Sequence, residues 1–90
     1  MPFVYILRCR DGSLYTGAAK DIVRRLDAHR AGTASKFTRS RRPLSLAWSH
    51  RVRTWRRALA LERRIKRLTR AEKLLLVTGS GPGHRGLPLG

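Results

Sequence analysis

The stretch Leu14–Gly32 constrains the fold more than any other part of the chain, because it joins a strand signal directly to a complete helix signal. Its first residues, Leu14-Tyr15-Thr16, favour a β-strand. Asp21 is a good N-cap, and Gly32 tolerates the left-handed conformation in which many helices end. The sequence therefore predicts a short strand followed by a helix from about Asp21 to Ala31.

The predicted helix carries two kinds of side chain on one side. Ile22, Val23 and Leu26 form an apolar stripe that should face a core. Arg25 and His29 lie one turn apart along the edge of this stripe. Because polar groups beside a core need a partner or a function, this edge is a first candidate for a functional site.

The remaining signals alternate between strands and helices. An apolar run from Phe3 predicts a strand, and Asp11-Gly12 predicts the turn of a β-hairpin. Later in the chain come an alternating run, an N-cap at Thr54 and a Thr-x-x-Glu capping box. The predicted order is strand Phe3–Leu7, strand Leu14–Gly17, the helix Asp21–Ala31, a basic loop over 32–43, strand Leu44–Ser49, helix Trp55–Leu68 and a short helix to about Val77. We therefore predict an α+β (mixed α/β) domain in which a small three-stranded sheet, a β-hairpin plus a third strand, is flanked by helices.

Residues 1–78 form the one predicted domain. From residue 79 to residue 90 the chain holds five glycines and two prolines, which cannot build a packed element. Residues 79–90 are therefore predicted to be a disordered tail.

The charge balance narrows the choice of partner. Lysine and arginine number 21 against 5 acidic residues, which gives a formal net charge of +16, and arginine supplies 17 of the 21. Arginine is suited to bidentate contact with phosphate, so nucleic acid is the expected partner. A compositional bias toward arginine, in a chain without asparagine or glutamine, is the alternative.

Cys9 is the only cysteine, which rules out an internal disulfide and a cysteine-based metal site and suits a small apolar role in the first strand. The longest apolar run, Leu74–Val77, is too short to span a bilayer, and no signal peptide is visible. We expect a cytoplasmic protein without a membrane partner, its oligomeric state open between a monomer and a weak dimer.

Glu62 does not fit its predicted helix. A helical wheel places it within the apolar arc that should pack on the sheet, whereas the other side is basic: Arg56, Arg57, Arg63, Arg64 and Arg67. A carboxylate on a buried face must be paired or must bind a metal ion. A salt bridge to Arg63, Lys66 or Arg25 would satisfy this requirement, and so would a metal site.

Together these candidates resemble a known family. Val4-Tyr5-Ile6 and Tyr15-Thr16-Gly17, about ten residues apart, resemble the paired signatures of the GIY-YIG endonuclease superfamily. Arg25, His29 and Glu62 match its helix-borne arginine and histidine and its metal-binding glutamate. The resemblance covers residues 3 to about 77 and is closest to the short single-domain bacterial branch. Val4 replaces the first glycine, Thr16 replaces isoleucine, and the active-site asparagine of several members has no counterpart.

The resemblance implies a metal-dependent endonuclease that hydrolyses phosphodiester bonds in DNA, in a setting such as repair or recombination. Tyr5 would be the general base, Arg25 would donate to the scissile phosphate, and Glu62 would hold Mg²⁺ or Mn²⁺. Tyr15 would position water or phosphate, and His29 would relay a proton or hydrogen-bond a tyrosine. The residues themselves leave other roles open: the tyrosines as cross-strand core aromatics, and His29 as a surface or helix-cap residue.

A second set of residues is expected to contact nucleic acid. The basic loop and the arginine face of the second long helix would follow the phosphate backbone, which gives affinity without strong sequence specificity. The residues expected to do so are Gly17, Lys20, Lys36, Thr38, Arg39, Arg41, Arg42 and Arg63. Gly17 would let a backbone approach closely, whereas Trp48 and Trp55 fit a core better than a base-stacking role.

Two other functions stay open at this point. One is a catalytically silent module that binds DNA or structured RNA. The other is an adaptor whose basic face meets an acidic protein. A cleavage assay with divalent cations separates the nuclease from both.

Overall fold

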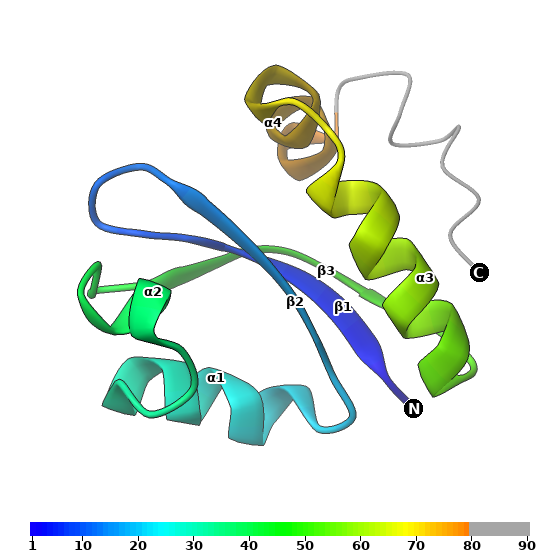
Figure 1. Cartoon of the computed structure of the whole chain (residues 1–90), viewed down its shortest axis with the longest axis horizontal. Helices are drawn as coiled ribbons and strands as arrows, with labels where there is room; N and C mark the ends of the chain where they lie inside the picture. Colours follow the sequence, from blue (N-terminus) through cyan, green and yellow to red (C-terminus); the bar gives the residue numbers. More distant parts are fainter. Residues whose placement is uncertain (80–90) are drawn as a thin grey trace.

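A computed structural model describes residues 1–79, which form a three-stranded sheet with helices packed on both faces (Figure 1). The elements are β1 (Phe3–Arg8), β2 (Leu14–Ala19), α1 (Ile22–Ala31), α2 (Lys36–Arg39), β3 (Ser45–Arg51), α3 (Trp55–Lys66) and α4 (Arg70–Thr78). The strand order is β2-β1-β3, and both strand pairs are antiparallel. The predicted α+β class is confirmed. No helix within residues 1–79 combines the length and the apolar character that a membrane crossing requires.

The central strand β1 divides the core into two clusters, because successive side chains of a strand point to opposite faces of a sheet. Val4 and Ile6 pack in a cluster with residues of α3 and α4. Tyr5 and Leu7 pack on the other face, in a cluster that includes Ile22 of α1. Figure 1 accordingly shows α1 and α2 on one side of the sheet and α3 and α4 on the other. Tyr5 therefore lies on the side of the sheet that α1 covers.

The hairpin turn forms as its residues predict. The side chain of Asp11 accepts a hydrogen bond from the backbone N–H of Ser13 at 3.0 Å, and Gly12 adopts a φ of 85° that favours glycine. β1 ends at Arg8, so Cys9 is buried just beyond the strand and not within it.

The helix caps also agree with the sequence. The side chain of Asp21 accepts from the backbone N–H of Arg24 at 3.1 Å, and Gly32 ends α1 in the left-handed conformation. Thr54 caps α3, and the predicted capping box at the start of α4 is present. Gly79, the first residue of the predicted tail, caps α4, and residues 80–90 lie outside the described residues.

Several details differ from the predictions. α3 ends at Lys66, two residues before the predicted end, and β2 continues two residues further, to Ala19. Val23 is 65% exposed, because α1 packs on the sheet through Ile22, Leu26 and His29. The predicted loop contains the four-residue helix α2, whose N-terminus is capped by the side chain of Ser35. β3 begins one residue later and ends two residues later than predicted, and it bulges because Ile6 pairs with Trp48 while Leu7 pairs with Leu46.

Candidate active site

Tyr5 lies across Gly17, its partner in the β1–β2 ladder. A Cβ atom on Gly17 would lie 2.5 Å from the Tyr5 hydroxyl oxygen and 2.6 Å from the ring carbon that bears it. Real Cβ atoms do not come so close, so the glycine is required by the tyrosine. Gly17 is buried, and this placement differs from the prediction that it admits a nucleic-acid backbone.

A chain of buried hydrogen bonds starts at the Tyr5 hydroxyl. It joins His29 Nε2 at 2.8 Å, and His29 Nδ1 joins Thr38 Oγ1 at 2.9 Å. Thr38 Oγ1 also donates to the backbone carbonyl of Ser35 at 3.4 Å. Because the Thr38 hydroxyl proton is used in that bond, His29 Nδ1 must donate to Thr38 Oγ1. His29 therefore adopts the tautomer in which Nδ1 carries the proton and Nε2 accepts from Tyr5. His29 and Thr38 come from α1 and α2, so the two helices together orient the imidazole.

The environment keeps the tyrosine protonated and the histidine neutral. Burial raises the pKa of Tyr5 to about 12, and the neighbouring Tyr15 adds to this rise. The charge and hydrogen bonding of Arg25 lower the pKa of Tyr5 in part, whereas the Glu62 carboxylate raises it. The pKa of His29 lies below its ordinary value, first because the ring is buried and second because Arg25 is near. At neutral pH, the imidazole is therefore available to accept a proton.

Tyr15 lies on the same side of the sheet and packs between two rings. Its ring meets the His29 ring edge-on at 5.3 Å between centroids and stacks on Phe37 of α2 at 5.8 Å. The Arg41 guanidinium covers Phe37 at 3.8 Å from the ring centroid. Tyr15 is thus held by the helix that also supplies Thr38.

Glu62 approaches this group of residues from α3. Its side chain is 18% exposed, and its Oε2 atom lies 3.0 Å from Nζ of Lys66, one turn further along the helix. Of the three predicted salt-bridge partners of Glu62, which are Arg25, Arg63 and Lys66, the structure shows Lys66. The Glu62 charge also raises the pKa of Tyr5, as the smallest of the effects on that hydroxyl, so the carboxylate lies within electrostatic range of it. The structure therefore brings together Tyr5, Tyr15, Arg25 and His29, and Glu62 acts on the Tyr5 hydroxyl through its charge.

Three of the predicted nucleic-acid contacts have structural partners within the domain. Thr38 is completely buried, so its side chain lies where a nucleic-acid strand cannot reach. Arg41 donates to Asp11 at 3.1 Å and to the Phe37 carbonyl at 3.0 Å. Arg42 donates to the carbonyls of Arg30 and Arg39 and so ties the end of α1 to α2. These side chains hold the basic loop in place.

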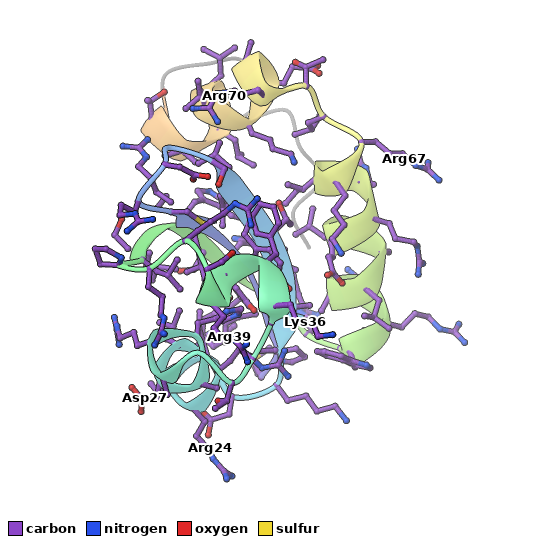
Figure 2. All side chains as sticks on the ribbon, turned by 60° about the vertical axis from the view of Figure 1, so that its left-hand side comes forward. Arg24, Asp27, Lys36, Arg39, Arg67 and Arg70 are labelled. Atoms are coloured by element: carbon purple, nitrogen blue, oxygen red, sulfur yellow. The ribbon has the colours of Figure 1, made fainter. Side chains whose placement is uncertain are left out.

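The other four predicted contacts are exposed: Lys20, Lys36, Arg39 and Arg63. In Figure 2, Lys36 and Arg39 of α2 lie on the same part of the molecule as Arg24 of α1, whereas Arg67 extends from the far end of α3. Of these four, Lys20 lies over the Trp55 ring, and all four are exposed enough to reach a phosphate backbone.

Known proteins are similar to this chain in sequence and in fold. The sequence model of the GIY-YIG catalytic domain matches residues 1–74. The chain belongs to the GIY-YIG family. UPF0213 proteins of Staphylococcus aureus strains Mu3 and Mu50 are each 47% identical to it over 75 residues, which cover 83% of this chain and 92% of each relative. The solution NMR structure of the UPF0213 protein BH0048 from Bacillus halodurans is 38% identical, with a TM-score of 0.59, and the match covers 93% of this chain and 90% of that one.

Two features of this GIY-YIG domain were missed by the sequence interpretation. Thr38 orients His29, and Phe37 supports Tyr15, but both fall within the predicted loop 32–43. A signal was present, since Ser35 is a good N-cap residue and its side chain accepts from the backbone N–H groups of Phe37 and Thr38. It indicates a short helical turn but not the residues against which that turn packs.

Proposed function

We propose that this GIY-YIG protein is a divalent-metal-dependent endonuclease that hydrolyses phosphodiester bonds in DNA with little sequence specificity. The observation that carries the proposal is the buried hydrogen bond between the Tyr5 hydroxyl and His29 Nε2, together with the charges of Arg25 and Glu62 that act on the same hydroxyl. A tyrosine, a neutral imidazole, a guanidinium and a carboxylate in one place supply the groups that phosphodiester hydrolysis requires.

Tyr5 and His29 act as a pair in this proposal. With a pKa of about 12, the Tyr5 hydroxyl is too weakly acidic to be ionised on its own at neutral pH. His29 Nε2 accepts the Tyr5 proton while the tyrosine oxygen accepts a proton from the attacking water. Thr38 keeps the imidazole in the tautomer that this transfer needs.

Arg25 connects the buried pair to the surface. It is exposed, and it also lies close enough to Tyr5 to affect the pKa of the hydroxyl. Because Tyr5 is completely buried, a substrate must move a neighbouring side chain to reach it. Arg25 is the side chain that moves in this proposal. It turns toward the scissile phosphate, where its positive charge offsets the negative charge that develops on the phosphoryl oxygens. Tyr15, fixed between two rings, positions the water or the phosphate.

Glu62 is the residue that would hold the metal ion. Within residues 1–79 no group of three or more histidine, cysteine or acidic side chains gathers into a metal cage. A single carboxylate nevertheless fits Mg²⁺ or Mn²⁺, because a hydrated Mg²⁺ binds through one or two carboxylates together with substrate phosphates. The present partner, Lys66, is 55% exposed and can turn into solvent. When bound, the ion would supply Lewis-acid stabilisation of charge on the phosphate.

The experiment that tests the proposal is a cleavage assay on single-stranded, duplex and branched DNA and on structured RNA, each with Mg²⁺, Mn²⁺ or EDTA. We expect products on DNA with a divalent ion and none with EDTA, because the Lewis-acid stabilisation would come from the ion that Glu62 would hold. Substrates that bind and stay intact with every ion would contradict the nuclease and favour a silent binding module.

A further inference from the structure

A hollow of about 520 Å³ opens beside the candidate active site, where β2 ends and where α1 and α3 begin. It is lined by Ala19, Lys20, Asp21, Arg24, Arg25 and Trp55. Its volume is within the roughly 300–1,000 Å³ of sites that bind small ligands. Of these residues, only Arg25 takes part in the proposed chemistry, so the proposed function leaves the other five without a role.

The lining combines positive charge with one aromatic face. Lys20 Nζ lies 5.4 Å from the centroid of the Trp55 ring, over its face. Asp21 is the only acid, and its carboxylate already accepts from the first turn of α1. Trp55 is half-buried and packs against the core cluster under α3, so its indole is anchored. The hollow therefore offers an anchored ring beside exposed cations.

A nucleotide matches this combination. Bases stack on anchored aromatic rings whatever their sequence, and lysine and arginine bind the flanking phosphates. A stacked base would displace Lys20 from the indole, and the ammonium would then meet the phosphate of the same nucleotide. A base inside a duplex cannot use the ring, because it is already stacked on both sides.

Arg25 fixes where such a nucleotide would lie along the strand. It lines the hollow, and it also neighbours Tyr5. A phosphate held by Arg25 for cleavage would place the adjacent nucleotide in the hollow. We propose that the hollow binds an unpaired nucleotide next to the scissile phosphate, with its base stacked on Trp55, and that the substrate is single-stranded DNA at this position. The register relative to the cleaved bond rests on the proposed function, whereas the binding of the base does not.

The test measures binding without cleavage. Trp48→Phe leaves Trp55 as the only tryptophan, because the chain has two. This variant is titrated in EDTA with a labelled oligothymidine and with a duplex of the same length, and anisotropy of the label reports binding while indole emission reports stacking. We expect the single strand to quench Trp55 emission by about half or more, and the bound duplex to leave it nearly unchanged. Binding of the single strand without quenching, or equal quenching by both, would overturn the proposal.

Two substitutions in the hollow provide a second measurement. Trp55→Leu should weaken binding of the single strand about tenfold, because stacking of one base is lost, and should change duplex binding little. Lys20→Ala keeps the indole and the fold, and should weaken single-strand binding several-fold. Unchanged affinity in both variants would overturn the proposal. If the protein cleaves DNA with Mg²⁺ but Trp55 emission does not change, the nucleotide-binding proposal for the hollow is wrong and the nuclease proposal stands. If Trp55 emission is quenched but no DNA is cleaved, the nuclease proposal is wrong and nucleotide binding in the hollow stands.

Discussion

Glu62→Gln should abolish cleavage while leaving the fold and nucleic-acid binding intact. The amide keeps the shape of the side chain but loses the charge that would hold a divalent ion, so the single-turnover rate should fall at least about 100-fold. The ion pair that is lost joins Glu62 to the exposed Lys66 within one helix, and such pairs contribute about 0.3–0.5 kcal/mol to the free energy of unfolding. We therefore expect the melting temperature to change by less than about 4 °C.

A matched control for this variant is Glu72→Gln, which makes the same chemical change in the capping box of α4. A glutamine can keep the hydrogen bond that Glu72 accepts from the backbone N–H of Thr69. Cleavage by this control should be close to that of the wild type. A Glu62→Gln protein that cleaves at the wild-type rate would show that Glu62 does not hold a required ion, and one that unfolds would show a structural ion pair.

Cleavage should depend on the neutral form of His29. Its pKa lies below the ordinary value of about 6.5, so the rate should rise with pH to a midpoint below 6.5 and then reach a plateau. The measurement is a single-turnover rate profile between pH 5 and pH 8. His29→Ala should lose this acidic limb and slow cleavage at least about 100-fold, because the Tyr5 proton has no acceptor. An acidic limb that persists in the variant would contradict the role of His29.

The same histidine links the stability of the domain to pH. Folding lowers the pKa of His29, so the unfolded chain binds its proton more readily than the native protein does. The contribution of neutral His29 to the free energy of unfolding is complete above the pKa of the unfolded chain, about 6.5. It is lost progressively as the pH falls from there toward the lower pKa of the folded protein. Melting temperatures of the wild type should therefore fall over this window, and the fall should be smaller in His29→Ala.

Most of the fold was predictable because its signals are local. Asp21 and Gly32 bound α1, Thr54 starts α3, and Asp11-Gly12 forms the turn, each through contacts within a few residues along the chain. The family resemblance, which the match to the GIY-YIG catalytic domain confirms, depends on the order and spacing of such elements. The anomaly of Glu62 was also visible, since helical periodicity is enough to place a residue within an apolar arc.

The rest depends on contacts between distant parts of the chain. Gly17 is required because the Tyr5 ring lies directly over it. The sequence of β2 alone does not predict this contact with a residue of β1. Thr38 meets His29 because the helix α2, only four residues long, packs on α1. Arg42 donates to two backbone carbonyls. In a chain this rich in arginine, the sequence does not distinguish such a structural arginine from one that binds phosphate.

The most direct test of the Tyr5–His29 pair is single-turnover cleavage of one DNA substrate with Mg²⁺ by the wild type and by Tyr5→Phe, purified side by side and compared at equal folded concentration. The substitution removes one oxygen atom and keeps the ring that lies over Gly17. It leaves His29 Nε2 without its partner, which costs about 1–3 kcal/mol and is accounted for by melting curves. We predict that the wild type cleaves and that Tyr5→Phe is at least about 100-fold slower. Equal rates for the two proteins, or no cleavage by the wild type, would contradict the account.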